Sequence, residues 1–142
     1  MVHAELMSTV KNGISTFRLL CNDEVLGNFF DEWAFQLAKK QSYHTVKTYS
    51  YAVLKFINYI LEVAEQYDGL TPIVINQALD SYESFLAFGE ESDCALAASI
   101  AKVLGSKPVG GSAIEINFTA VNRFIDASET LRIAMLDFER LG

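Results

Sequence analysis

The 142-residue sequence predicts an all-α fold: a bundle of four main helices, with a short extra helix and a small β-element at the N-terminus. Two observations predict the helices. After residue 22, apolar residues recur three and four positions apart, as on the buried face of a helix. Residues that cap helices or form turns separate these apolar stripes. The β-element is predicted by Asn12-Gly13, which lies between two strand-like runs and is typical of a hairpin turn.

The composition is that of a single globular domain. Hydrophobic residues make up 51% and charged residues 20%, which excludes a disordered chain. No apolar run approaches the roughly 20 residues of a membrane span, and the N-terminus lacks the pattern of a signal peptide. Cys21 and Cys94 are far apart in sequence, so two free thiols and a cytoplasmic location are expected. The formal net charge of −7 argues against non-specific nucleic-acid binding but leaves room for a local basic face.

Residues 1–21 are predicted to form a hairpin or strand arm, and residues 22–142 a helical domain. In the arm, alternation places Phe17, Leu19 and Cys21 on one face. Asn22 is a candidate cap for a first helix at about 23–40. The expected buried stripe of this helix comprises Leu26, Phe29, Phe30, Trp33 and Leu37.

Ser42 is expected to cap a second helix at about 43–66, before the Asp68-Gly69 turn signal. Its buried stripe is expected to comprise Tyr49, Val53, Phe56, Ile60 and Val63. The opposite, solvated face is expected to carry His44, Lys47, Tyr51, Lys55 and Asn58.

Thr71-Pro72 combines a capping hydroxyl with proline at the first helical position and predicts a third helix at about 72–88. Its expected stripe comprises Ile75, Leu79, Tyr82 and Leu86. An Ala-rich segment then predicts a short helix, capped at Ser92 or Asp93 and ended by Gly105. The segment that follows, 106–117, contains Pro108, Gly110 and Gly111 and is expected to be a loop.

A long last helix is expected to begin at about Asn117. Its buried side is expected to follow Phe118, Val121, Ile125, Leu131, Met135 and Phe138. Across the whole chain, the residues predicted to be mostly buried are Trp33, Tyr49, Phe56, Ile60, Leu79, Tyr82 and Phe124.

The second predicted helix lies within a stretch without negative charge. Residues 33–61 contain no Asp or Glu, and their charged side chains are Lys39, Lys40, Lys47 and Lys55, with His44 beside them. An acid-free face suits a surface that meets phosphate groups, although a few lysines on a solvated helix are also common.

Motifs of enzymes are not found in the sequence. Gly110-Gly111 lacks the Lys-Ser/Thr of a phosphate-binding loop, and no serine has a Gly-x-Ser-x-Gly setting. His3 and His44 do not stand at a zinc-site spacing from the cysteines. We therefore expect no catalytic residue, no metal and no cofactor.

Three segments together resemble the N-terminal core-binding domain of the tyrosine recombinases, the phage-integrase family. Leu70-Thr71 is similar to the family's start of the third helix. In the second helix the resemblance lies in Ser42, Thr45, Thr48, Tyr49, Leu54, Phe56 and Tyr59. In the last helix it lies in Thr119, Asn122, Arg123, Phe124 and Ile125. The resemblance covers about residues 14–138, and residues 89–116 form a longer insertion than is usual in the family.

The resemblance implies a SAM-like orthogonal bundle that clamps duplex DNA opposite a separate catalytic domain. The family's Arg, His-x-x-Arg and nucleophilic Tyr belong to that domain, which is absent from this chain. The implied partners are double-stranded DNA, the catalytic domain of the same parent chain, and further recombinase copies on DNA. The implied DNA contacts are His44, Thr45, Lys47, Thr48, Lys55, Asn122 and Arg123.

A helical protein–protein interaction module without DNA binding is the alternative. The Ala-rich segment 94–104 and the acidic surfaces of the third and last helices suit a protein partner. A DNA reader is expected to gather its cations on one face, whereas an interaction module is expected to scatter them and expose an apolar patch.

Overall fold

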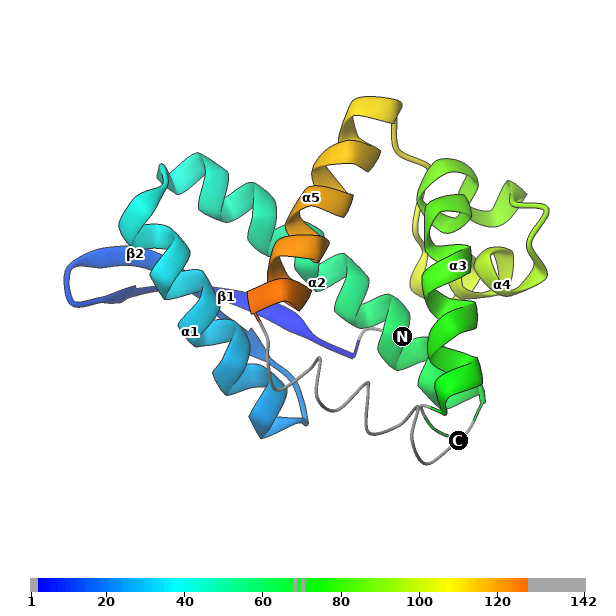
Figure 1. Ribbon diagram of the computed structural model, residues 1–142, viewed down its shortest axis with the longest axis horizontal. Coiled ribbons are helices and arrows are strands. Elements are labelled where there is room, and N and C mark those ends of the chain that lie inside the picture. Colours follow the sequence, from blue (N-terminus) through cyan, green and yellow to red (C-terminus); the bar gives the residue numbers. More distant parts are fainter. Residues whose placement is uncertain (1–2, 68, 70, 128–142) are drawn as a thin grey trace.

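The computed structural model describes residues 3–67, 69 and 71–127. It is mainly helical, with a small N-terminal sheet (Figure 1). The elements, in chain order, are β1 (Glu5–Lys11), β2 (Ile14–Leu20), α1 (Glu24–Lys40), α2 (Tyr43–Gln66), α3 (Pro72–Phe88), the 3₁₀ turn η1 (Gly89–Glu91), α4 (Ala95–Leu104) and α5 (Gly111–Ala127). The predicted β-element, main helices and short extra helix are therefore confirmed. Within the described ranges, no helix has both the length and the apolar character needed to cross a membrane.

The N-terminal hairpin forms as predicted. β1 and β2 pair antiparallel, and Lys11 faces Ile14 across the turn. Asn12 and Gly13 have φ values of 52° and 78°, the left-handed conformation that a two-residue hairpin turn requires. Phe17 and Leu19 are buried on one face of β2.

Helix α1 covers the free edge of β2. The Leu19 N–H donates to Asp31 Oδ1 at 2.8 Å, and Arg18 Nε lies 3.3 Å from Asp31 Oδ2. The carboxylate thus satisfies a backbone donor that would otherwise be open to pairing with another strand.

Helix α2 is shared by two hydrophobic clusters. Val53 and Ile57 pack with the hairpin and α1, whereas Tyr59 and Val63 pack with α3 and α4. Helix α5 crosses α2 and also serves both clusters, because Phe124 joins the first and Val121 the second (Figure 1). These two helices hold the two halves of the molecule together.

The starts of the first three helices are set by side-chain caps. Ser42 Oγ accepts from the Thr45 N–H at 3.2 Å, and Thr71 Oγ1 accepts from the Val74 N–H at 3.3 Å, as predicted. The cap of α1 was assigned wrongly to Asn22. Asp23 is the cap, because its Oδ1 accepts from the Leu26 N–H at 3.0 Å.

The boundaries after α3 differ from the prediction. Cys94, rather than Ser92 or Asp93, is the N-cap of α4, while Ser92 Oγ accepts from the Cys94 N–H at 3.0 Å. Gly105 ends α4 with φ 65°, as predicted. The predicted loop over 106–117 is wrong in its second half, because α5 begins at Gly111. Gly110 and Gly111 suggested a loop. The residues after them form a helix because Ile114 and Phe118 pack on the second cluster.

Most of the predicted core is confirmed. Tyr49 and Ile60 are partly buried against the clusters, and four predicted residues are buried: Trp33, Phe56, Tyr82 and Phe124. Leu79 was assigned wrongly, since 36% of it is exposed. Helix α3 instead buries Val74, Ala78, Tyr82, Phe85 and Leu86. The Ile75 side chain and the predicted positions Leu131, Met135 and Phe138 lie outside the described residues.

Candidate nucleic-acid interface

The first turns of α2 expose several groups that suit phosphate. His44 and Lys47 are exposed, and Thr45 and Thr48 are partly exposed. No acidic side chain stands in the first turn of α2. The helix dipole therefore adds to the positive potential of these residues rather than being neutralised by a carboxylate.

The Thr45 hydroxyl is oriented by the cap residue. Ser42 Oγ donates to Thr45 Oγ1 at 3.1 Å. A hydroxyl that accepts a hydrogen bond still has its own hydrogen to donate. Thr45 is thus arranged as a donor near the surface, which fits a contact with a phosphate oxygen.

Helix α5 brings the second group of predicted residues to α2. Asn122 and Arg123 are both exposed in the last part of α5. The Arg123 guanidinium lies 5.4 Å from the centre of the Tyr49 ring on α2, a cation–π contact. Tyr49 was assigned to the core from its spacing, and its role as a support for Arg123 was missed because only tertiary packing reveals it.

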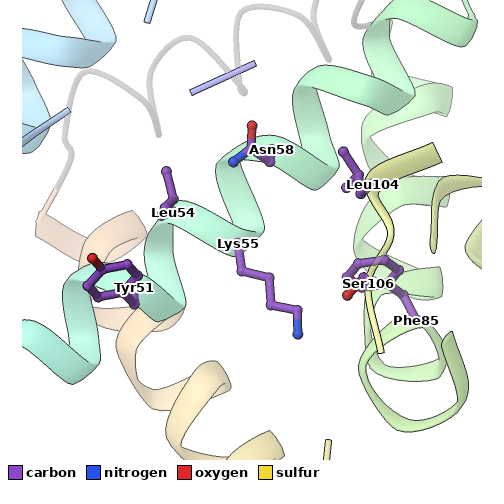
Figure 2. A pocket seen from close by; sticks show the side chains of 7 residues that line it. All are labelled: Tyr51, Leu54, Lys55, Asn58, Phe85, Leu104 and Ser106. Atoms are coloured by element: carbon purple, nitrogen blue, oxygen red, sulfur yellow. The ribbon is translucent and has the colours of Figure 1, made fainter. Parts of the chain in front are cut away.

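Lys55 is not on a freely solvated face, contrary to the prediction. Its ammonium lies 5.9 Å from the centre of the Phe85 ring of α3. Burial lowers the pKa of the Lys55 amine below its ordinary value. Figure 2 shows its side chain extending away from α2 among the labelled residues. These residues line a depression of about 380 Å³: Tyr51, Leu54, Lys55, Asn58, Phe85, Leu104 and Ser106.

Asn58 was also assigned wrongly to the solvated face. It is buried, and its Oδ1 accepts from the backbone N–H groups of His3 and Ala4, each at 2.8 Å. Its Nδ2 donates to the Ala4 carbonyl at 3.0 Å. The N-terminal arm covers this part of α2, and the periodicity of α2 alone could not show that.

The predicted cations do not form one continuous patch. Lys39 lies 4.7 Å from the centre of the Phe35 ring, which Lys11 also approaches, whereas Lys55 faces α3. Lys47 and Tyr49 are two residues apart in a helix, so they point in directions about 160° apart. Lys47 and the Arg123 held on Tyr49 therefore lie on different sides of α2. The predicted DNA contacts therefore form two separate groups. The first group lies in the first turns of α2 and comprises His44, Thr45, Lys47 and Thr48, and the second lies on α5 and comprises Asn122 and Arg123.

The buried tyrosines are unsuited to act as nucleophiles. Burial raises the pKa of the Tyr59 hydroxyl to about 12, despite its hydrogen bond with Ser81. Burial and the neighbouring Tyr59 also raise the pKa of the Tyr82 hydroxyl. Both groups stay protonated at neutral pH and belong to the core.

A second polar cluster was missed by sequence reasoning. His3 contacts Glu62 and Glu65 of α2. The i, i+3 spacing of the two glutamates, which places them on one helix face, could be recognised in the sequence. The approach of His3 could not, because it depends on how the N-terminal arm packs on α2.

Comparisons of this chain with protein-family models, with curated proteins and with solved structures found no match.

Proposed function

We propose that this chain is a DNA-binding domain of the kind that clamps duplex DNA in phage-integrase recombinases, with α2 and α5 toward the DNA. The observation that carries the proposal is the packing of α5 on α2. The two helices that the resemblance assigns to DNA are in contact, with Arg123 against Tyr49. Thr45 stands four positions before Tyr49 and so shares its side of α2, which supports a surface that runs from the Thr45 hydroxyl to Arg123 on α5.

The exposed charges of α2 and α5, spread over more than one side of α2, support weak, salt-dependent binding. His44 and Lys47 on α2 and Arg123 on α5 are exposed, but α5 also exposes Glu115 and Asp126. With a formal net charge of −7, the body repels phosphate at long range. We expect non-specific dissociation constants on the order of 10⁻⁴–10⁻⁶ M at physiological salt, and tighter binding at low salt.

A charge-reversal experiment tests the proposal. Lys47→Glu and Arg123→Glu, combined in one chain, should abolish binding of a labelled duplex in an anisotropy titration. In the single variants, removing one phosphate-binding cation should reduce the slope of log affinity against log salt by about one. The thermal midpoint should change little, because both side chains are exposed.

Lys102→Glu combined with Lys107→Glu is the matched control. Both lysines are exposed, and they lie in and after α4, which packs near the opposite end of α2 from Lys47. This variant has the same net charge as the test variant. If both variants bind the duplex with equally reduced affinity, net charge rather than the α2–α5 surface controls binding, and the proposal is wrong.

A helical protein-interaction module is the second candidate, and one observation favours it. The cations rest on separate aromatic rings, namely Phe35, Phe85 and Tyr49, instead of forming one patch. The same titration separates the candidates, because an interaction module should show no saturable binding to duplex DNA even at low salt.

A further inference from the structure

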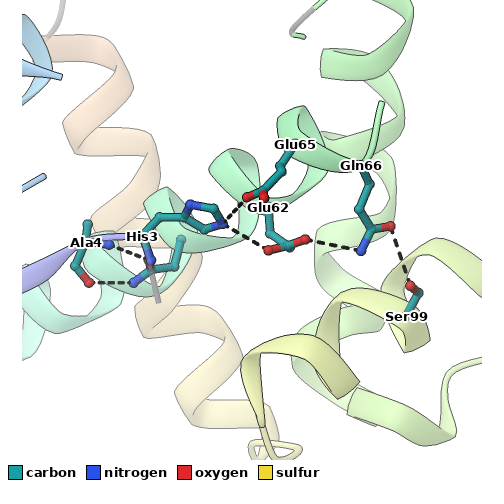
Figure 3. A network of polar contacts seen from close by, with 7 residues as sticks. His3, Ala4, Glu62, Glu65, Gln66 and Ser99 are labelled. Carbon is teal, nitrogen blue, oxygen red and sulfur yellow. Dashed lines mark hydrogen bonds and ion pairs between the residues drawn. The ribbon is translucent and has the colours of Figure 1, made fainter. Parts of the chain in front are cut away.

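Three potential metal ligands converge where the N-terminal arm meets α2. His3 Nε2 lies 2.9 Å from Glu62 Oε1 and 3.2 Å from Glu65 Oε2. Figure 3 shows the imidazole directed toward both carboxylates, which project from the same side of α2. Within the described residues, these three side chains form the group of His and acidic ligands close enough to share one ion.

The His3 nitrogen that faces the two carboxylates cannot hydrogen-bond to both of them at once. A single imidazole nitrogen carries at most one hydrogen, yet His3 Nε2 faces two carboxylate oxygens. The Glu62 side chain is only 7% exposed, so its charge is largely removed from water. Glu62 has His3 and Gln66 as hydrogen-bonding partners, whereas a divalent cation among the three atoms would serve both glutamates at once.

The two His3–glutamate distances are close to those around a small tetrahedral ion, and all three ligand atoms lie within 4.8 Å of one another. Zinc bonds to nitrogen and oxygen of about 2.0–2.2 Å place neighbouring ligand atoms roughly 3.3–3.5 Å apart. The two His3–glutamate distances of 2.9 and 3.2 Å need to open by only a few tenths of an ångström. One histidine with two carboxylates leaves a fourth position for water, the pattern of an open zinc site.

Neighbouring residues hold these ligands in place. Gln66 Nε2 donates to Glu62 Oε2 at 3.4 Å, and Gln66 Oε1 accepts from Ser99 Oγ at 3.5 Å (Figure 3). The His3 backbone N–H is bonded to the buried Asn58. Ligands of metal sites are commonly oriented by such outer hydrogen bonds.

Solvent can reach the cluster from one side. His3 lines an open depression of about 510 Å³ together with Cys21, Asp23 and Leu61. Glu65 is itself 58% exposed at its side chain. An ion therefore has a route to the ligands without opening the core.

We propose that His3, Glu62 and Glu65 bind one Zn²⁺ ion, which ties the segment before β1 to the second half of α2. The ion replaces two polar contacts that share one nitrogen with three metal–ligand bonds. This site is independent of DNA binding, since its residues are not among those assigned to the DNA surface.

Zinc titration of the full chain tests the proposal. The protein is prepared without a histidine tag, treated with a chelator and titrated with Zn²⁺ in a calorimeter. We expect one ion per chain and a thermal midpoint that rises with zinc concentration. His3→Ala and Glu65→Gln should each abolish this binding. Because Glu65 is largely exposed, its variant should keep the wild-type circular dichroism spectrum in chelator.

His44→Ala and Glu83→Gln are the matched controls, since both residues are exposed and lie outside the cluster. Both controls should bind zinc like the wild type. Absence of stoichiometric binding by the wild type, or full binding by the His3 and Glu65 variants, would overturn the proposal and leave the cluster as polar contacts only.

Cobalt substitution identifies the ligands independently. Co²⁺ should give visible ligand-field bands of a low-coordinate site, without the near-ultraviolet charge-transfer band of a thiolate. Cys21→Ser should leave these bands unchanged. A thiolate band that disappears in Cys21→Ser would place the ion at the cysteine in the neighbouring depression and overturn the assignment.

Discussion

Lys55 shows at the scale of one residue how a charge can oppose folding. Its stem packs between α2 and α3, and burial lowers the pKa of its amine. The unfolded chain therefore binds the proton more tightly than the folded protein does between the lowered pKa and 10.5. The cost of holding this charge is present below the folded pKa and is relieved as pH rises through that window.

Lys55→Met should consequently raise the free energy of unfolding at pH 7, because it retains the packing and removes the charge. The advantage over wild type should shrink as pH approaches 10.5. Urea unfolding of both proteins at several pH values measures this difference in the free energy of unfolding. Lys102→Met, at an exposed position, is the control. The difference in free energy of unfolding between this variant and the wild type should change little with pH. A variant less stable than wild type at pH 7 would mean that the ammonium contributes favourably through Phe85.

Phe124 links α5 to α1 through aromatic contacts. It is 1% exposed, and its ring centre lies 5.2 Å from those of both Phe29 and Trp33. Phe124→Ala should lower the free energy of unfolding by about 3–5 kcal/mol, since it leaves a cavity in the first cluster. Denaturant unfolding followed by Trp33 fluorescence measures this decrease. Phe88→Ala, at a residue 56% exposed, should cost under about 1 kcal/mol; equal decreases would contradict the assigned core.

The hairpin turn shows how an element depends on backbone conformation. Gly13 has φ 78°, and apart from its two chain neighbours no residue has an atom within 4 Å of the position where a Cβ would be. Gly13→Ala should therefore cost about 1 kcal/mol through backbone strain alone, without a clash. Thermal unfolding measures this effect. Gly110→Ala is the control, because that position is equally open and its φ is not positive, so its midpoint should stay near wild type.

At the scale of the whole molecule, α2 connects the hairpin and α1 on one side to α3 and α4 on the other. The proposed function requires this body to hold DNA while a separate domain carries out the chemistry. We expect no covalent protein–DNA adduct when the chain is incubated with a nicked suicide duplex and resolved by denaturing electrophoresis. A slower-migrating labelled species would contradict the proposal. Tyr43→Phe, Tyr51→Phe and Tyr67→Phe would then test the exposed tyrosines at the start, in the middle and at the end of α2.

The sequence by itself determined the local structure. The Asn-Gly turn, the Ser42 and Thr71 caps and the glycine at the end of α4 act through neighbouring backbone groups, so they were readable without the fold. Strong stripes also identified much of the core. In α3 the apolar residues did not mark a single buried face, because Ile73 and Leu79 are apolar and yet exposed.

Only the tertiary structure decided which faces of α2 remain open. The N-terminal arm buries Asn58, and Lys55 packs against Phe85 of α3. Helix α5 brings Arg123 into contact with Tyr49. The convergence of His3 with Glu62 and Glu65, which are about 60 positions away in the sequence, has the same origin. Helical periodicity says which residues share a face, but the partner that covers the face is chosen by burying apolar area between elements distant in sequence.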